Sequence, residues 1–217
     1  MKKSLSAIIF TSLLGTAYCA QASIAYQSDD RYIYHSKAAS TVTPSSPYAD
    51  FNGSWWAWEA GAFQNTSLTA TGMSGTGSTY AGFDAAHYGA NAKSSFSVTF
   101  SVDQLSSYTL NGALNAIYYD SGVYAKLWEN GSEIFASDPY ATNYWSNGPG
   151  NFSQSGQFIP GNTYKLDLYS YSIYSDYHNE SWQFDLTTSP VPVPAAVWLL
   201  GSGLISLVGF ARKRKVA

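Results

Sequence analysis

The chain has 217 residues, of which 45% are hydrophobic and only 12% are charged. All 14 acidic residues lie between Asp29 and Asp185, whereas more than half of the 11 basic residues lie near the two termini, so the central part is strongly acidic. An acidic surface repels nucleic-acid phosphates, so we expect no nucleic acid as a partner. The only cysteine is Cys19, close to the N-terminus, which excludes cysteine-based metal sites and thiol catalysis in the central part.

The first 22 residues have the pattern of a secretory signal peptide. The charged pair Lys2-Lys3 is followed by an apolar run over about Leu5–Leu14, and Ala20-Gln21-Ala22 then forms an A-x-A cleavage site. We therefore expect residues 1–22 to form a signal helix that signal peptidase removes after Ala22. The mature protein would then begin at Ser23.

A lipoprotein signal ending at Cys19 is the alternative interpretation of this segment. Tyr18 precedes Cys19, whereas lipoprotein signals need a small residue at that position. Both interpretations predict export. Residues 23–188 then form one extracellular domain, which is long enough to bury a core without disulfide bonds.

Alternation of apolar and polar residues marks strands in the second half of this domain. Asn130-Gly131 is a strong hairpin signal because both residues tolerate positive φ, and Pro160-Gly161-Asn162 is a turn signal. The strands expected from the alternation are Phe96–Val102, Tyr108–Leu114, Val123–Trp128, Glu133–Ala136, Thr163–Leu168 and Trp182–Leu186.

The pattern is weaker in the first half of the domain. We expect strands over Ser23–Tyr34 and Trp56–Ala62, a loop over the glycine-rich segment Gly72–Gly82, and a short helical turn within Ala85–Ala92. Many short strands without amphipathic helices predict an all-β fold. The expected architecture is an antiparallel two-sheet sandwich of the jelly-roll type.

No catalytic or cofactor-binding motif is found in the sequence, so we expect no cofactor and no enzymatic activity. Oxygen-rich segments at Asp29-Asp30 and Ser175–Glu180 have the ligand chemistry of calcium sites but not the spacing of an EF-hand loop, so no metal is assigned. A secreted glycan hydrolase with paired carboxylates is the least favoured alternative. The residues considered for catalysis are His35, His87, His178, Glu59, Glu129, Glu133 and Glu180.

Aromatic clusters are the feature of the domain with the clearest functional alternatives. Successive residues of a strand point to opposite faces, so the aromatic residues of Trp55–Trp58 cannot all face one core. These rings either fill the core and its cross-strand pairs or stack on the C–H faces of sugar rings. The candidates for glycan contact are Trp55, Trp56, Trp58, Tyr144 and Trp145.

The last part of the chain, residues 189–217, has three parts. Alternating prolines over Pro190–Pro194 predict an extended spacer. The uncharged run Ala195–Ala211 would span about 25 Å as a helix, which matches a thin bilayer and predicts a transmembrane helix. The basic tail after it should stay on the cytoplasmic side of the membrane. This tail consists of Arg212, Lys213, Arg214 and Lys215.

This arrangement resembles the PEP-CTERM sorting signal, in particular its VPLPA-CTERM variant. The motif residues are Val191, Pro192, Val193, Pro194 and Ala195, and the resemblance covers residues 189–215. Val193 stands where the Pro-Glu-Pro form has glutamate. The resemblance implies recognition by an exosortase, a membrane protease of Gram-negative bacteria that make exopolysaccharide. A plain C-terminal membrane anchor is the alternative.

These observations favour a non-enzymatic protein of the cell envelope or extracellular matrix. We expect an intermediate held in the inner membrane by the C-terminal helix, followed by release to the cell surface or the medium. Its expected partners are signal peptidase, the exosortase, the membrane and exopolysaccharide. A dedicated carbohydrate-binding module that uses exposed Trp and Tyr is the alternative function.

Overall fold

The computed structural model of the protein describes residues 22–36, 40–56, 60–82, 90–116, 122–138, 150–173 and 178–192, and these form strands joined by turns. The strands, in chain order, are β1 (Ile24–Asp29), β2 (Tyr32–His35), β3 (Ser40–Val42), β4 (Phe51–Trp56), β5 (Ala60–Thr69), β6 (Gly72–Ala81), β7 (Asn91–Val102), β8 (Ser106–Asn115), β9 (Gly122–Glu129), β10 (Ser132–Ser137), β11 (Gly150–Phe158), β12 (Tyr164–Ile173) and β13 (His178–Pro190).

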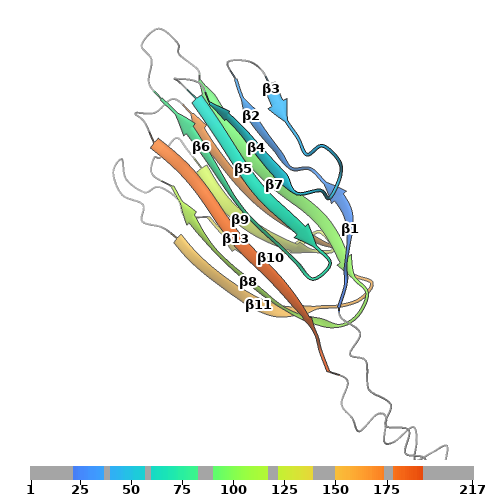
Figure 1. Ribbon diagram of the computed structural model, residues 1–217. Coiled ribbons are helices and arrows are strands. Elements are labelled where there is room, and N and C mark those ends of the chain that lie inside the picture. The colour runs from blue at the N-terminus through green and yellow to red at the C-terminus, as the bar shows by residue number, and fades with distance from the viewer. Residues whose placement is uncertain are drawn as a thin grey trace, which may run out of the picture.

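The strands form two antiparallel sheets that pack face to face as a β-sandwich (Figure 1). Sheet A has the order β10-β9-β12-β7-β2-β3, and β1 joins it by pairing with the C-terminal part of β7. Sheet B has the order β11-β8-β13-β6-β5-β4. The predictions of an all-β fold and of two antiparallel sheets are confirmed.

The core lies between the two sheets, where alternate residues of the strands point inward. On β7, the apolar residues of Phe96–Val102 are buried and the residues between them are half-exposed, as the alternation predicted. The ring centroid of Phe100 lies 5.3 Å from that of Phe158 and 5.7 Å from that of Tyr164. Burial of such apolar surface is the main stabilising contribution to a fold without disulfides.

The two predicted turns are also confirmed. Asn130 and Gly131 join β9 to β10 with φ values of 49° and 81°, the combination of positive angles that a type I′ hairpin turn requires. Gly161 has a φ of 89° in the turn between β11 and β12. The predicted strands at residues 108–114, 123–128, 133–136, 163–168 and 182–186 coincide with β8, β9, β10, β12 and β13, apart from Thr163 at the edge of β12.

The prediction of a loop over Gly72–Gly82 is wrong, because residues 72–81 form β6 inside sheet B. The reason lies in the neighbouring strands of the same sheet, where Trp182 is opposite Gly77 and Thr66 is opposite Gly75. Gly77 points inward below the ring of Trp182, and a side chain at this position would overlap the indole and the Ser94 hydroxyl. Gly75 likewise faces the side chain of Thr66 on β5. The glycines here make room for larger neighbours in the core.

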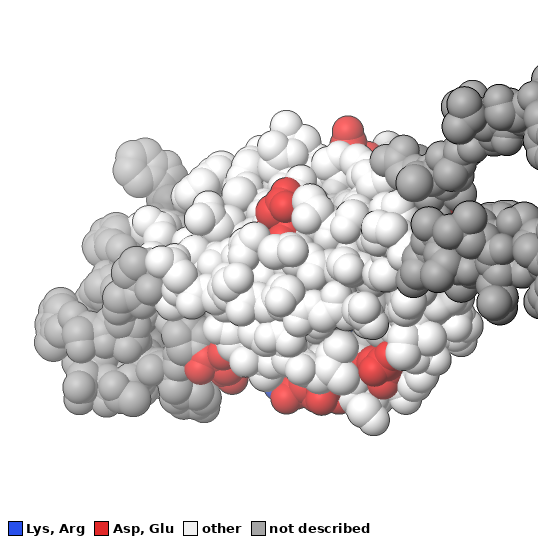
Figure 2. All heavy atoms as spheres, turned by 90° about the horizontal axis from the view of Figure 1, so that it is seen from below, with Lys and Arg blue, Asp and Glu red and all other residues white. Residues whose placement is uncertain are grey.

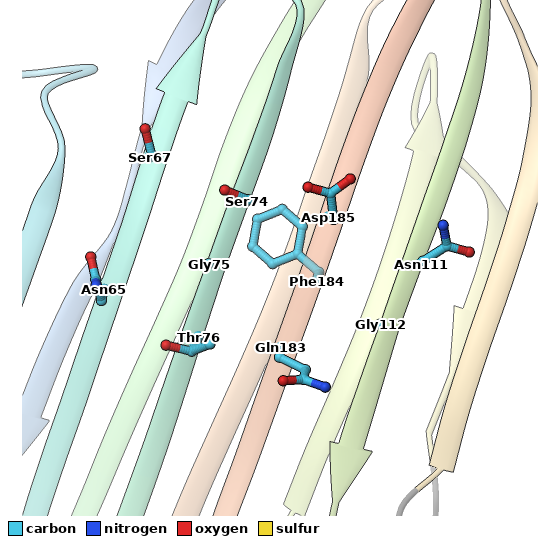
Figure 3. A pocket seen from close by; sticks show the side chains of 10 residues that line it. All are labelled: Asn65, Ser67, Ser74, Gly75, Thr76, Asn111, Gly112, Gln183, Phe184 and Asp185. Carbon is cyan, nitrogen blue, oxygen red and sulfur yellow. The ribbon is translucent and has the colours of Figure 1, made fainter.

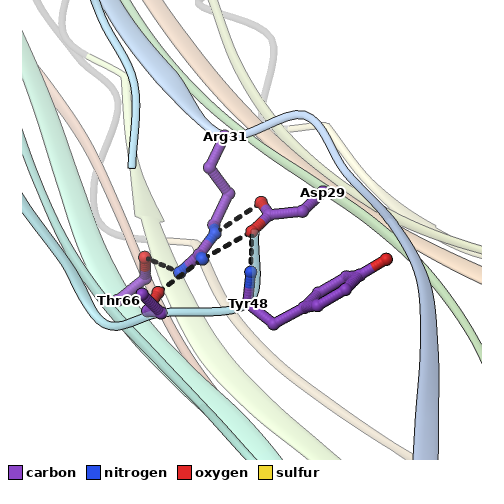
Figure 4. Close-up of polar contacts among 5 residues, drawn as sticks. Asp29, Arg31, Tyr48 and Thr66 are labelled. Atoms are coloured by element: carbon purple, nitrogen blue, oxygen red, sulfur yellow. Dashed lines mark hydrogen bonds and ion pairs between the residues drawn. The ribbon is translucent and has the colours of Figure 1, made fainter. Parts of the chain in front are cut away.

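The predicted strand over Ser23–Tyr34 is two strands, β1 and β2, with a break at Asp30 and Arg31. Both strands pair with β7 in the same register, Asp29 opposite Val98 and Tyr32 opposite Ser95. The Arg31 side chain is fully buried, and its guanidinium donates two hydrogen bonds of 2.7 Å to the Asp29 carboxylate (Figure 4). It also donates to Thr66 Oγ1 at 2.9 Å and to the Ala49 carbonyl at 2.6 Å. A paired, hydrogen-bonded charge therefore lies between the two sheets at the break between β1 and β2.

One further prediction for the first half of the domain needs correction, and another falls mostly outside the described residues. The expected strand Trp56–Ala62 is in fact the point where the chain reverses, since β4 ends at Trp56 and pairs antiparallel with β5, which begins at Ala60. The expected helical turn over Ala85–Ala92 lies outside the described residues up to position 89, and its last two residues, Asn91 and Ala92, begin β7.

Both ends of the described sandwich lie at the same end of the molecule (Figure 1). The amide of Ser23 donates to Asp103 Oδ1 at 2.8 Å, and the amide of Val191 donates to the carbonyl of Leu105 at 3.1 Å. The turn between β7 and β8 thus holds both ends. Within the ranges described above, no helix is long and apolar enough to cross a membrane. The predicted signal and transmembrane helices fall outside these ranges, apart from Ala22.

Candidate functional site

The outer face of sheet B consists almost entirely of neutral side chains, most of which carry hydroxyl or amide groups. We call these outward positions of the six strands the neutral face. Among them, Asp185 is the only charged residue that the structure describes. The antiparallel register aligns the side chains in rows across the sheet. The central row is Asn52, Asn65, Thr76, Gln183, Ala113 and Asn151, and the next row is Ser67, Ser74, Asp185, Asn111 and Ser153.

The middle of the neutral face is hollowed into a shallow trough. An open depression of about 670 Å³ lies over β5, β6, β13 and β8, with Asn65, Gln183 and Asp185 among its lining residues (Figure 3). A second hollow of about 370 Å³ shares Thr76 and Gln183 with the first. The small outward side chains of β6 form the floor of the trough, while longer amide side chains project beside it.

An aromatic platform lies on the same face, two rows from the central row. Trp56 is 60% exposed and its ring lies over Gly61, where any side chain would overlap the indole. The ring centroid of Tyr80 lies 6.2 Å from that of Trp56. The backbone of Gly61 therefore lets the indole lie against the sheet with its other side open to solvent.

The outer face of sheet A has a different chemical character. Every described lysine projects from it: Lys93, Lys126 and Lys165. Lys126 pairs with Glu133 at 3.2 Å, and Lys165 pairs with Asp167 at 2.9 Å. Tyrosines on this face pack on one another, as in the stacked pair Tyr124 and Tyr169 with ring centroids 5.5 Å apart. Burial raises the pKa of both tyrosines.

Of the aromatic residues proposed for glycan contact, the structure places only Trp56 on an exposed surface. Trp55 points inward and stacks face to face on His35, which supports the core interpretation for this residue. Burial lowers the pKa of His35. Trp58, Tyr144 and Trp145 lie outside the described residues. Trp55 and Trp56 therefore point to opposite faces of sheet B, as expected for successive residues of a strand.

Among the acidic residues considered for catalysis, the three that the structure describes do not converge on the neutral face. Glu129 accepts hydrogen bonds of 2.8 Å from the Asn162 amide and the Tyr164 hydroxyl. Glu133 takes part in the ion pair with Lys126. Glu180 is buried and faces the interior of the sandwich, and Glu59 is not among the described residues.

The positions considered for metal binding or histidine chemistry are described only in part. The Asp29 carboxylate is occupied by Arg31 and by the amide of Tyr48 at 2.7 Å. No group of three or more His, Cys, Asp or Glu that could hold a metal ion occurs in the described part of the chain. His87 and the side chain of His178 lie outside that part.

The processing residues are described only where they meet the sandwich. Ala22 is buried, and Ser23 is bonded to Asp103. Val191 is half-buried against the β7–β8 turn, and Pro192 is exposed. The remaining residues of the two signals lie outside the described residues, namely Ala20, Val193, Pro194, Ala195, Arg212, Lys213, Arg214 and Lys215.

Reasoning from the sequence did not identify the neutral face. Its signal was the polar half of each alternating segment, such as Gln183 and Asp185 between the buried residues of β13. Segments of this kind usually carry charges on the solvent side, whereas here they carry Ser, Thr, Asn and Gln. Which segments lie side by side could not be read from the alternation itself.

Comparisons with known proteins do not assign the chain to a family. No protein-family model matches it, and no curated protein matches it in sequence. Among solved structures, the GH31 α-xylosidase from Xanthomonas citri is similar with 8% identity and a TM-score of 0.27, over 78% of this chain. This chain covers 28% of the length of that structure. A TM-score at this level carries no argument about fold or activity.

Proposed function

We propose that the protein is a non-enzymatic component of the cell surface or extracellular matrix, and that the neutral face contacts exopolysaccharide. The observation that carries the proposal is the extended, nearly uncharged array of hydroxyl and amide groups across the six strands of sheet B. These groups both donate and accept hydrogen bonds, as sugar hydroxyls do. Removing water from them costs much less than removing water from charged groups.

The shape of the face fits an extended polymer. The trough is open and shallow, so a chain could lie along it without threading into a cavity. Strands in a sheet lie about 4.8 Å apart, so the side chains present a regular grid to the ligand. Trp56 supplies an aromatic surface for the C–H face of a sugar ring beside this grid.

A dedicated carbohydrate-binding module would use the same face, so the two functions differ in selectivity. A matrix component should bind the producing cell's polysaccharide broadly through many weak contacts, whereas a dedicated module should prefer one glycan. Binding to a glycan array distinguishes them. A single strong glycan hit that depends on Trp56 would favour the module.

We further infer that the two terminal segments direct the protein to this location. Residues 1–22 form the signal helix and residues 195–211 a transmembrane helix, and the domain between them is a sandwich of the jelly-roll type. The resemblance of Val191–Ala195 to the VPLPA-CTERM motif supports processing by an exosortase. The strand β13 leads directly into this motif, so a protein held by its C-terminal helix would have the β7–β8 turn at the membrane side.

Mass spectrometry of surface protein from an exosortase-bearing host tests the sorting step. We expect mature protein that lacks Trp198–Arg212 and a precursor that contains it in the inner membrane. Replacing Pro192-Val193-Pro194 should block cleavage and leave membrane insertion intact, and deleting Arg212–Lys215 should impair retention. Abundant mature protein that still contains Trp198–Arg212 would reduce the segment to a permanent anchor.

Co-sedimentation with the host exopolysaccharide tests the binding step. Contacts between neutral groups are little affected by salt, whereas ion pairs at the surface are screened. We therefore expect binding to persist between low salt and 0.5 M NaCl, the latter being about the concentration at which screening is strong. Loss of binding at high salt would instead point to the lysines of sheet A, and absence of binding at any salt concentration would refute the proposed contact.

A further inference from the structure

The N-terminal edge of the sandwich contains a carboxylate placed at the predicted processing site. Asp103 Oδ1 lies 2.8 Å from the backbone nitrogen of Ser23, the residue that follows the expected cleavage site. The amide of Asp103 also donates to the carbonyl of Ser23 at 3.2 Å. Asp103 therefore contacts both the amide and the carbonyl of Ser23. The bond between the two backbones holds the Asp103 side chain close to the Ser23 nitrogen.

We propose that the Asp103 carboxylate is the binding site for the free α-ammonium group of Ser23, so that removal of the signal peptide creates an ion pair. This inference rests on the proposed export and deepens it. Signal peptidase would hydrolyse the Ala22–Ser23 amide with one water molecule. Ala22 would then carry the new carboxylate, and Ser23 the new amine, which takes up a proton at neutral pH.

Cleavage changes the chemical nature of the group that the Ser23 nitrogen presents to Asp103 in the folded domain. Before cleavage, the donor at Ser23 is a neutral amide N–H. After cleavage, it is an ammonium group, and hydrogen bonds between two charged groups are shorter and about twice as strong as those between neutral ones. The nearby bond from the amide of Ile24 to the carbonyl of Ala70 at 2.8 Å fixes the start of β1 in both forms.

The same geometry indicates the order of processing and folding. Ala22 is only 1% exposed, and Ser23 is bonded through both its amide and its carbonyl. A protease must bind several residues on each side of the cleaved bond in an extended, accessible form. Cleavage at this bond should therefore precede the addition of β1 to β7, and the ion pair should form as the strand joins the sheet.

The sign of the pH dependence distinguishes the ion pair from a neutral hydrogen bond. An α-amino group paired with a carboxylate should have a pKa above its ordinary range of about 7.7–8.0. Such a group contributes stability that is fully present below its unfolded pKa and is lost as the pH rises through its folded pKa. The contribution of Asp103 should therefore be larger at pH 6.5 than at pH 10. Since Asp103 is exposed, it should also diminish with added salt.

The experiment uses the chain exported with its own signal peptide, in four forms. These are the wild-type chain, Asp103→Asn, a chain with one glycine inserted between Ala22 and Ser23, and that insertion combined with Asp103→Asn. The insertion leaves the residue before the cleavage site unchanged but makes the Ser23 nitrogen an amide again. Asp138→Asn, at an exposed position just after β10, is made in both backgrounds and controls for the change in net charge. Intact mass establishes each N-terminus, and urea midpoints are measured at pH 6.5 and 10 in low salt.

We expect Asp103→Asn to lower the midpoint at pH 6.5 and to lower it less at pH 10. In the inserted background, its effect should be small and equal at both pH values, and Asp138→Asn should have the same effect in both backgrounds. A Ser23 N-terminus combined with a pH-independent effect of Asp103→Asn, or with no effect, would overturn the ion pair while leaving export intact. A mature mass that begins elsewhere, for example at a lipid-modified Cys19, would overturn the proposed cleavage site together with the ion pair.

Discussion

Replacing Gly77 with alanine tests how β6 packs in the core, because the packing decides whether the free energy of unfolding rises or falls. In an unobstructed strand, alanine is more favourable than glycine by about 0.5–1 kcal/mol. Here the added methyl group would overlap the indole of Trp182 and the hydroxyl of Ser94, both of which are fully buried. Overpacking of a core typically costs about 1–3 kcal/mol, so we expect Gly77→Ala to reduce the free energy of unfolding by that amount.

The measurement is urea unfolding followed by tryptophan fluorescence, with Ser78→Ala as a matched control on the outer face of the same strand. A surface change of this kind should alter the free energy of unfolding by less than about 0.5 kcal/mol. Trp182→Phe should itself destabilise the core, but it leaves room for the new methyl group. The double variant should therefore lose less free energy of unfolding than the sum of the losses in the two single variants. A neutral or stabilising effect of Gly77→Ala would refute the placement of Trp182 over β6.

Two further predictions concern stability. Phe100→Ala should cost about 3–5 kcal/mol because the ring is fully buried, whereas Thr99→Ala on the solvent side of β7 should cost little, and equal losses in urea unfolding would contradict the assigned faces. Arg31→Met should cost about 3–5 kcal/mol because it leaves Asp29 buried without its partner. Burial alone would raise the pKa of Asp29, but the hydrogen bonds from Arg31 and Tyr48 bring it below 3.8. The loss of stability caused by Arg31→Met should therefore shrink as the pH falls below about 4. A loss that does not change with pH would contradict the ion pair.

Features encoded by adjacent residues could be predicted from the sequence. The apolar alternation of Phe96–Val102 has the strand period, and the pair Asn130-Gly131 has the only backbone preference that a two-residue hairpin of this type needs. Both signals are complete within about ten residues. The strands that carry them, β7, β9 and β10, accordingly lie where the sequence predicted them.

Features that depend on distant partners could not be predicted in this way. Gly77 lies in a glycine-rich segment whose composition is typical of a loop. Only the position of Trp182, far along the chain, explains why a strand needs a glycine there. Arg31 lies buried at the break between β1 and β2, and its partners include Thr66 on β5 of the other sheet. In both cases the partner is far along the chain, on the adjacent strand of the same sheet for Gly77 and on the opposite sheet for Arg31, and it overrides the preference of the local segment.

The neutral face belongs to the same class of features. Each outward residue is an ordinary polar residue in its own strand, and the face exists only once the register places six strands in order. Thr76 and Gln183, for example, are neighbours in the trough although they come from β6 and β13. The aromatic candidate Trp56 was found from the sequence because three tryptophans in four residues is unusual in itself, but its platform on Gly61 required the β4–β5 pairing.

The most direct test of the account is the affinity of the exported protein for its host's exopolysaccharide when the neutral face is altered. The double change Thr76→Ala and Gln183→Ala removes two central hydrogen-bonding groups. Each should contribute about 0.5–1.5 kcal/mol, so binding should weaken by about fivefold to a hundredfold. The matched double change Ser97→Ala and Thr99→Ala on the outer face of sheet A should leave binding unchanged. Unchanged binding after the first change, or equal loss after the second, would contradict the assignment of the neutral face as the glycan-contacting surface.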